Sequence, residues 1–359
     1  MLDDKTKVDL LVSLAKTYSP SGCERQVALT LEQFLKEHVD EVFIDDAGNV
    51  IAMRGRGPVL MLHAHMDTVP GPLNIRFSED ALVGLGVADD KAPLAAMAVA
   101  IAELEHVPCK VVFAGVVEEE TTSRGTKFLI EEVERDAVPR PAAIIVGEPT
   151  GIDRIVYAYR GSLHVRIVAR ARGGHASTPI CSENPIVTVY EIYKKICDKL
   201  NAGTRYDTIT AVPTIIRGGE APNMIPTMCE LEIDIRIPPS LSCEWVLKQL
   251  QALKEKLTSS VELHVGECTE PIMVDISNIA ARAVSRAIIK ILRKPPTPAK
   301  KWGTSDMNLL AKITRNLIAY GPGEHETLHT YEEVVKISDY LTSIRIYETA
   351  IEEFSRLLH

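Results

Sequence analysis

Two spacings of apolar residues alternate along the first 160 residues of the chain. Helical spacing recurs in four segments, Asp4–Lys16, Glu24–Glu37, Pro93–Glu105 and Arg124–Glu134, the last of them predicted to be capped by Ser123. Between these segments lie short apolar or β-branched runs typical of strands, Val42–Ile44, Val50–Met53, Val59–Leu62, Cys109–Val117 and Ala142–Val146. Strands that alternate with helices predict an open, largely parallel sheet, which places its chemistry at the carboxyl ends of the strands.

The order of elements changes at about Gly161. The pattern there predicts a strand, a helix, two strands, a helix and a strand, at Leu163–Arg170, Pro185–Leu200, Thr208–Ile216, Thr227–Ile237, Cys243–Leu257 and Val261–Val265. This βαββαβ order is that of the ferredoxin-like unit. From about Pro271 mixed helical and strand patterns resume and end in a helix from Glu332 to about Leu357. We therefore expect an α/β protein with a discontinuous domain, residues 1–160 and 270–359, and an inserted domain, residues 161–269.

Length, charge and cysteine content narrow the class of protein. A chain of 359 residues can form two domains with full cores, and its net charge of −9 argues against nucleic acid as a partner. No apolar run is long enough to cross a membrane and the first residues lack a signal-peptide pattern, so we expect a cytoplasmic protein. The seven cysteines are odd in number and include no C-x-x-C pair, which predicts reduced thiols and no disulfide framework.

Histidines and acidic residues follow three of the predicted strands. His65 and Asp67 come directly after the strand at Val59–Leu62, and an Asp two residues from a His can accept the second ring N–H of a metal-bound imidazole. A hydrolytic site with two metal ions needs His and carboxylate ligands, one bridging carboxylate, and one free carboxylate that accepts a proton. The chain offers six such groups, His65, Asp89, Glu119, Glu120, Glu148 and His329.

Six short motifs occur together in one order, His65-x-Asp67, Gly86-x-x-Asp89-Asp90-Lys91, Glu119-Glu120, Gly147-Glu148-Pro149-Thr150, Gly174-His175-Ala176-Ser177 and Gly303-Thr304-Ser305-Asp306. In this order they resemble the co-catalytic zinc peptidases and deacylases, a family that includes aminoacylases, glutamate-releasing carboxypeptidases, acetylornithine deacetylase and succinyl-diaminopimelate desuccinylase. The resemblance covers nearly the whole chain. It implies a zinc-peptidase-like, mostly parallel sheet flanked by helices, with an inserted ferredoxin-like domain that forms dimers.

The resemblance also implies a role for each matching position. Two Zn2+ ions, for which Co2+ could substitute, would be held by five ligands, His65, Asp89 as the bridge, Glu120, Glu148 and His329. Asp67 would orient His65, Glu119 would be the general base, and the peptide bond that follows Asp89 would be cis. His175 would reach the partner's active site in a homodimer and hydrogen-bond the developing oxyanion. The substrate carboxylate would meet four residues, Asn223, Arg236, Arg160 and Thr304.

Several of these residues have simpler interpretations. The run Glu118–Glu120 also fits a solvated helix start, and its three consecutive glutamates leave the register of the base open by one position. The segment His325–His329 matches H-E-x-x-H, but that zinc motif must lie within a helix, whereas this segment follows Gly321-Pro322-Gly323. We therefore reject the motif and keep only His329 as a ligand. His63 is expected to be a core histidine or a residue behind the ligands.

Within the family, the segment Tyr157–Ser162, the short chain and the segment Asp90–Ala96 look most like one branch. That branch releases lysine or ornithine from the C-terminal glutamate of a small acidic amino-group carrier protein, in lysine or arginine biosynthesis. The bond cleaved is an amide to the α-amino group. The alternatives are a small-molecule N-acyl-amino-acid deacylase, acting on acetyl-lysine, acetylornithine or succinyl-diaminopimelate, and a dipeptidase or carboxypeptidase. A metal-free binding protein on the same fold is a different class, against which the intact ligand set speaks.

Overall fold

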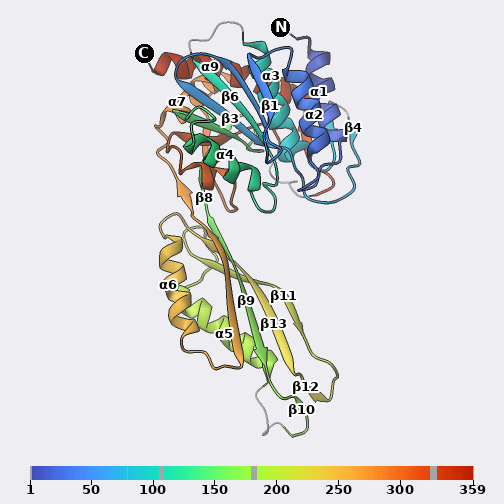
Figure 1. Ribbon diagram of the computed structural model, residues 1–359, viewed down its shortest axis with the longest axis vertical. Coiled ribbons are helices and arrows are strands. Elements are labelled where there is room, and N and C mark those ends of the chain that lie inside the picture. Colours follow the sequence, from blue (N-terminus) through green and yellow to red (C-terminus); the bar gives the residue numbers. More distant parts are fainter. Residues whose placement is uncertain (1, 79, 105–108, 179–183, 324–329, 359) are drawn as a thin grey trace. The chain divides into compact units, whose positions relative to one another are not determined.

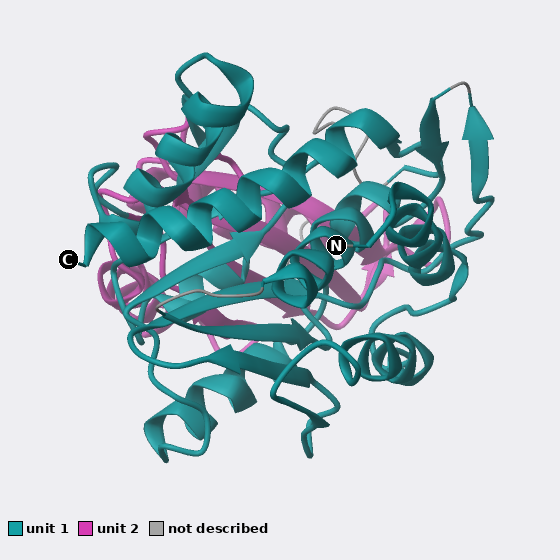
Figure 2. Cartoon of the chain, turned by 90° about the horizontal axis from the view of Figure 1, so that it is seen from above, with its two compact units in different colours: residues 1–157, 274–300, 305–359 teal, residues 158–273, 301–304 magenta. Residues whose placement is uncertain are grey.

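The computed structural model describes residues 2–78, 80–104, 109–178, 184–323 and 330–358 (Figure 1). The chain divides into two compact units, which Figure 2 shows in different colours. Unit 1 consists of Met1–Tyr157, Val274–Lys300 and Ser305–His359, and unit 2 consists of Ala158–Met273 and Lys301–Thr304. The predicted inserted domain, residues 161–269, falls inside unit 2, which extends beyond it at both ends.

Of the described strands, nine form one mixed sheet in the order β1-β2-β6-β3-β7-β17-β8-β15, with β16 paired to β8. The bounds are Glu41–Ile44 (β1), Val50–Gly55 (β2), Lys110–Val116 (β6), Val59–His65 (β3), Ala143–Gly147 (β7), Leu317–Tyr320 (β17), Arg154–Tyr159 (β8), Ile272–Met273 (β15) and Thr297–Lys301 (β16). The central strands β6, β3, β7 and β17 pair in parallel, and the outer pairs β1-β2, β2-β6, β17-β8 and β8-β15 are antiparallel. The predicted α/β class with a parallel sheet centre is confirmed.

The helices of unit 1 pack around this sheet because their apolar faces are continuous. They are Asp4–Lys16 (α1), Arg25–Leu35 (α2), Ala92–Glu103 (α3), Arg124–Glu134 (α4), Ile279–Leu292 (α7), Asp306–Leu310 (α8) and Ile337–Leu357 (α9). Helix α3 is apolar on all sides, and it is buried from Ala92 to Ala102 against β3, β6, α1 and α9. None of the described helices combines the length and the apolar composition that a membrane span requires.

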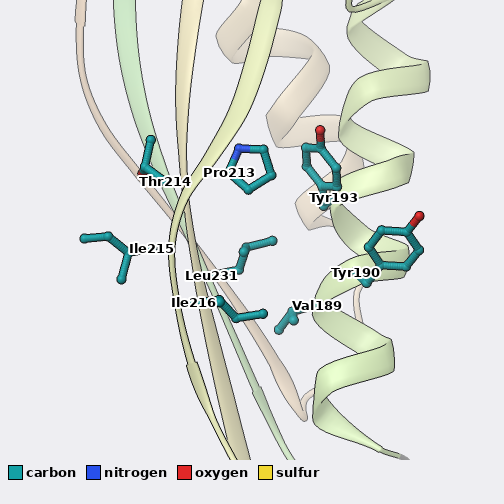
Figure 3. A pocket seen from close by; sticks show the side chains of 8 residues that line it. All are labelled: Val189, Tyr190, Tyr193, Pro213, Thr214, Ile215, Ile216 and Leu231. Carbon is teal, nitrogen blue, oxygen red and sulfur yellow. The ribbon is translucent and has the colours of Figure 1, made fainter.

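Unit 2 contains an antiparallel sheet in the order β11-β13-β9-β14. Its elements are Gly161–Arg170 (β9), Pro185–Leu200 (α5), Thr210–Gly218 (β11), Met228–Ile237 (β13), Cys243–Lys254 (α6) and Val261–Thr269 (β14). Buried and solvent-facing side chains alternate along β13, and the buried ones pack with α5 and α6 in one core. This element and strand order is the predicted ferredoxin-like fold. An apolar pocket of about 250 Å³ lies between α5 and the edge strand β11 (Figure 3).

Short strands were missed by the periodicity of the sequence. They are Arg76–Ser78 (β4), Ala81–Val83 (β5), Gly174–His175 (β10), Met224–Ile225 (β12), β15 and Val334–Lys336 (β18), and the longer strand β8 was missed as well. Because β18 pairs with β5, the last helix begins at Ile337 and not at Glu332. Ser123 is the N-cap residue of α4, as predicted, but it has a positive φ of 49° and its side chain makes no capping hydrogen bond to the helix.

The cysteine prediction is corrected by a disulfide between Cys243 and Cys268. These residues lie at the start of α6 and near the end of β14, and their Cα atoms are 5.9 Å apart. Sequence spacing could not reveal the pair, because the two cysteines are 25 positions apart and the segment between them includes a helix whose packing brings the ends together. Four other cysteines are free thiols, Cys23, Cys109, Cys197 and Cys229.

Candidate metal centre

The candidate site lies at the carboxyl ends of three neighbouring parallel strands. Strand β3 lies between β6 and β7, and the three strands end at His65, Val116 and Gly147. Each is followed by the polar residues that the sequence singled out. Because the carboxyl ends of parallel strands meet at one edge of a sheet, these residues converge although they are far apart in the chain.

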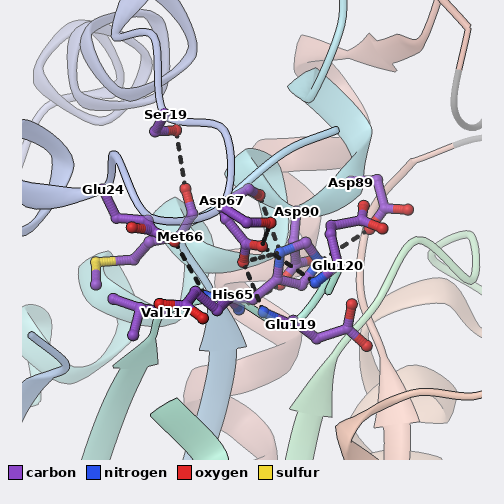
Figure 4. Close-up of polar contacts among 12 residues, drawn as sticks. Ser19, Glu24, His65, Met66, Asp67, Asp89, Asp90, Val117, Glu119 and Glu120 are labelled. Carbon is purple, nitrogen blue, oxygen red and sulfur yellow. Dashed lines mark hydrogen bonds and ion pairs between the residues drawn. The ribbon is translucent and has the colours of Figure 1, made fainter. Parts of the chain in front are cut away.

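Three side chains at this edge are grouped closely enough to share one metal ion. The ligand atoms of His65, Asp89 and Glu120 all lie within 4.8 Å of one another. The ring Nε2 of His65 is 3.1 Å from Oδ1 of Asp89, and Figure 4 shows the carboxylate of Glu120 beside them. The peptide bond between Asp89 and Asp90 is cis, as the resemblance implied. Imidazole nitrogen and carboxylate oxygen are ligands that zinc and other divalent ions accept.

The charges around this group also fit a cation. Burial raises the pKa of Asp90 well above its usual range, and the nearby carboxylates of Asp89 and Glu148 raise it further. Burial likewise raises the pKa of Glu119, with Glu120 among the carboxylates that add to the effect. Buried carboxylates close together are costly unless positive charge balances them. The donor set and its excess of negative charge therefore fit a divalent metal.

Asp67 connects the His65 ring to the acidic loop that follows β6. Nδ1 of His65 is 3.0 Å from the backbone oxygen of Asp67 and 3.3 Å from its Oδ1. The carboxylate of Asp67 also accepts the backbone N–H groups of Glu119 and Glu120, at 3.0 and 3.1 Å (Figure 4). The hydroxyl of Ser21 donates to it at 2.7 Å. Asp67 therefore sets both the direction of the imidazole ring and the path of the acidic loop.

The three consecutive glutamates have different environments. Glu118 has a φ of 59°, and its carboxylate accepts hydrogen bonds from Arg124 and Thr122. Glu119 is half-buried, and the charges of Glu120, Glu148 and Asp306 act on it, while Glu120 belongs to the group with His65. The interpretation of Glu118–Glu120 as a helix start is wrong, because α4 begins only at Arg124. The assignment of Glu119 as base and Glu120 as ligand stays a prediction that this arrangement permits.

Of the two remaining predicted ligands, Glu148 lies within the described residues and His329 does not. Glu148 follows β7 directly, and its charge contributes to the raised pKa values of Asp90 and Glu119. His329 lies outside the described residues, as does the rest of the segment 324–329 with the rejected H-E-x-x-H match. The ligand set therefore stays a prediction at both positions.

The predicted substrate residues all belong to unit 2. Arg236 donates to Asp234 through Nε and Nη2, at 2.7 and 3.0 Å, and its Nη1 is 3.4 Å from the hydroxyl of Thr304. Nη2 of Arg160 donates to the backbone oxygen of Arg236 at 2.7 Å, and its buried guanidinium lies 5.4 Å from the centre of the Trp302 ring. Three of the four residues are therefore neighbours within this unit.

His175 and Asn223 lie together near the β10-β12 ribbon of unit 2. His175 is exposed and pairs with Met224 across the ribbon, while the backbone oxygen of Asn223 accepts the N–H of Ala176 at 2.8 Å. Nδ1 of His175 is 2.7 Å from the hydroxyl of Ser177. The ring nitrogen Nε2 has no hydrogen bond within the described residues that would compete with a ligand there.

Sequence reasoning missed Glu333. Its buried carboxylate accepts the backbone N–H groups of Ala88 and Asp89, both at 3.1 Å, and so supports the turn Val87–Lys91 (η1). Burial raises the pKa of Glu333 to about 7, and Asp89 adds to the effect. No local pattern marks this residue, because its partners lie 244 and 245 residues earlier in the chain.

A buried polar chain also lies behind His65. Nε2 of His63 is 2.8 Å from the hydroxyl of Thr126, which donates to Oδ2 of Asp306 at 2.5 Å. Burial lowers the pKa of His63 to about 3, so this histidine is neutral, and burial raises the pKa of Asp306 to about 6. Asp306 belongs to one of the six sequence motifs, but its position there predicts no role, and no sequence pattern marks Thr126.

Comparison with known proteins gives consistent results. The family model described as "Peptidase family M20/M25/M40" matches residues 61–353. A Pyrobaculum aerophilum protein with the provisional name LysW-lysine/LysW-ornithine hydrolase is 42% identical over 96% of each chain. The LysW-lysine/LysW-ornithine hydrolase of Sulfurisphaera tokodaii is 34% identical over 96% of this chain and 94% of that one. The structure of an M20 family metallo-carboxypeptidase from Sulfolobus solfataricus superposes with a TM-score of 0.84 at 18% identity, covering 99% and 100% of the two chains.

Proposed function

Because this chain belongs to peptidase family M20/M25/M40, we propose that it is a metal-dependent hydrolase that releases lysine or ornithine from an acidic amino-group carrier protein. The bond cleaved is the amide to the α-amino group of the released amino acid. The observation that carries the proposal is the 42% identity to a relative with this named activity, which extends over 96% of the chain and includes both units. A biosynthetic reaction of this kind supports a cytoplasmic location for the enzyme.

The proposed metal ligands are the five predicted residues, His65, Asp89, Glu120, Glu148 and His329. Asp89 would be the ligand shared by two Zn2+ ions, for which Co2+ could substitute. The grouping of His65, Asp89 and Glu120 within 4.8 Å supports this assignment. When bound, the ions polarise the amide carbonyl and lower the pKa of the attacking water.

The protein's own groups handle the proton and the charge. Glu119 accepts the proton of the water and delivers it to the leaving α-amino group, as a general base that then acts as acid. Glu119 is half-buried among carboxylates, and desolvation raises its pKa, which suits a group that must hold a proton between the two steps. Asp67 keeps the His65 ring in position through its contact with Nδ1.

Substrate recognition is assigned to unit 2. Arg236 and Arg160, with Asn223 and Thr304, bind the carboxylate of the amino acid or of the carrier glutamate. Their closeness supports a shared role, since Arg160 contacts Arg236 and Arg236 contacts Thr304. Asp234 already pairs with the Arg236 guanidinium, so a substrate carboxylate shares this cation with it or displaces it.

We further propose a homodimer in which His175 serves the partner's active site. The oxyanion that develops on the amide carbonyl accepts a hydrogen bond from this ring. The edge strand β11 supports the assembly, because Val212, Ile215 and Ile216 are exposed on it beside the pocket of Figure 3. An apolar strand edge is a template for pairing, and a second copy could pair with it symmetrically.

The test is a comparison of substrates with the zinc-loaded protein. The panel is a lysine adduct of the carrier protein, acetyl-lysine, acetylornithine, succinyl-diaminopimelate and a dipeptide. We expect the adduct to have the highest kcat/KM and a chelator to abolish its turnover. A higher kcat/KM for any of the small molecules would overturn the proposed substrate, and turnover that persists without any divalent metal ion would overturn the proposed metal site.

A further inference from the structure

The loop between α1 and α2 does more than separate two helices. Its sequence, Ser19-Pro20-Ser21-Gly22-Cys23-Glu24, reads only as a helix breaker. In the structure, three of its side chains bond to segments that carry the candidate site, those of Ser19, Ser21 and Glu24. Ser19 and Glu24 are buried and Ser21 is half-buried, so these bonds are at least partly shielded from water.

Ser19 and Ser21 hold the segment that carries Asp67. The hydroxyl of Ser19 donates to the backbone oxygen of Met66 at 3.0 Å, and the backbone oxygen of Ser19 accepts the N–H of Thr68 at 3.0 Å. Ser21 donates to Oδ2 of Asp67 at 2.7 Å (Figure 4 includes Ser19, Met66 and Asp67). Hydrogen bonds from this loop therefore hold the Asp67 carboxylate and the backbone of its two neighbours, Met66 and Thr68.

Glu24 holds the acidic loop after β6. Its Oε1 accepts the N–H of Glu118 at 3.0 Å, across 94 residues of sequence, and the N–H of Gly22 at 2.9 Å. Although Glu24 stands at the start of α2, its side chain does not cap that helix. The next two N–H groups of the acidic loop, those of Glu119 and Glu120, go to Asp67. Three consecutive N–H groups are thus accepted by two buried carboxylates.

We propose that Ser21 and Glu24 are positioning residues of this site, with Glu24 setting the acidic loop and Ser21 setting Asp67. Neither touches the metal ligands through its side chain in the described contacts, so both act through the residues that they hold. The expected loss of turnover rests on the proposed function. The expected change in the backbone of the acidic loop does not. Partners that orient the ligands of a metal site typically change affinity or activity about 10- to 100-fold when removed.

The experiment compares Glu24→Leu, which removes the acceptor, with Glu24→Gln, whose amide oxygen can still accept both N–H groups. Glu37→Leu, at an exposed position beyond α2, is the control. The readouts are amide hydrogen exchange of residues 117–120, zinc affinity by calorimetry, and kcat and KM. We expect Glu24→Leu to exchange faster at this loop, to bind zinc about 10- to 100-fold more weakly and to lose kcat with little change in KM. Glu24→Gln should stay within a few-fold of the wild type.

The inference would be overturned if folded Glu24→Leu exchanged its amide hydrogens at residues 117–120 as slowly as the wild type. It would also be overturned if Glu24→Gln lost as much zinc affinity and kcat as Glu24→Leu. If Glu24→Leu does not fold, Ser21→Ala provides the test, because it deletes only one hydroxyl of a half-buried side chain and should still weaken zinc binding. An unchanged zinc affinity and kcat in Ser21→Ala would then overturn it. A wild type that binds no zinc and hydrolyses nothing refutes the proposed function separately, since the exchange measurement does not depend on it.

Discussion

Oδ1 of Asp67 accepts a hydrogen bond from the backbone N–H of Glu119 at 3.0 Å, between residues 52 positions apart in the chain. The same carboxylate lies 3.3 Å from the ring of His65. The residue that orients the predicted first ligand therefore also positions the predicted base. Substitution of Asp67 should therefore impair both metal binding by His65 and proton transfer by Glu119, whereas substitution of Glu119 should impair only proton transfer.

Glu119→Gln should keep nearly normal zinc affinity and lose about 10²- to 10⁴-fold in kcat, because it removes the base and no ligand. Calorimetry and steady-state kinetics on the carrier adduct measure the two effects. Glu118→Gln is the matched control, since the Glu118 carboxylate instead pairs with Arg124 at 2.7 Å. If Glu119→Gln lost zinc while Glu118→Gln lost activity, the assigned register would be off by one.

Metal content gives a second prediction. Elemental analysis of the zinc-loaded protein should find about two ions per chain, as in other two-metal hydrolases. Removal by a chelator should abolish turnover, and either Zn2+ or Co2+ should restore it. A single tightly bound ion with full activity would contradict the bridging role of Asp89.

The proposed role of His175 in the partner's site is tested by mixing two inactive variants. His175→Ala should lose about 10²- to 10³-fold in rate, the usual cost of one oxyanion donor. In a heterodimer with Glu119→Gln, one site has its own Glu119 and receives an intact His175 from the other chain. Activity should then return toward half of the wild-type value. Demonstrated subunit exchange without recovery would refute the role.

The disulfide between Cys243 and Cys268 should stabilise unit 2. It closes a loop of 25 residues, for which chain entropy predicts a contribution of about 3 kcal/mol to the free energy of unfolding. The Cys243→Ser, Cys268→Ser double variant should lose this amount in denaturant unfolding, and reductant should have no further effect on it. Cys23→Ser, at an exposed thiol, is the control. Seven titratable thiols in the unfolded, unreduced protein would show that the bond does not form.

Glu353 gives a prediction about pH. Burial alone would raise its pKa, but hydrogen bonds from Lys290, Arg356 and Arg286 outweigh burial and lower the pKa from 4.5 to about 2. A lowered pKa in the folded state means that the stabilisation is present above pH 4.5 and is lost as the pH falls toward 2.

Glu353→Gln should therefore be less stable than the wild type at pH 7, by about 1–2 kcal/mol because the three cations are half-exposed. The difference should shrink as the pH falls from 4.5 toward 2. Urea unfolding at several pH values measures it, with Glu352→Gln as the control, since Glu352 pairs only at the surface with Arg356. A difference that does not change with pH would contradict the assigned pKa.

The sequence alone determined the elements whose signal is local. Apolar runs and their spacing predicted β3, β6 and β7, and the polar residues directly after them, such as His65, Asp67 and Glu148, had to meet because parallel strands end at one edge. The βαββαβ order of unit 2 followed in the same way from periodicity. Short strands such as β18 were missed, since three residues carry too little pattern.

Only the tertiary structure decided how side chains from distant segments pair. Residues 118–120 are all glutamates, so the sequence does not distinguish them. Their environments differ because Glu24 and Asp67, from other parts of the chain, accept the backbone N–H groups of this loop. The support of Asp89 by Glu333, and the pairing of Cys243 with Cys268, likewise depend on how helices and strands pack. Hydrophobic periodicity is a property of neighbouring residues, whereas a hydrogen bond across 94 or 244 positions exists only once the packed core has brought both ends together.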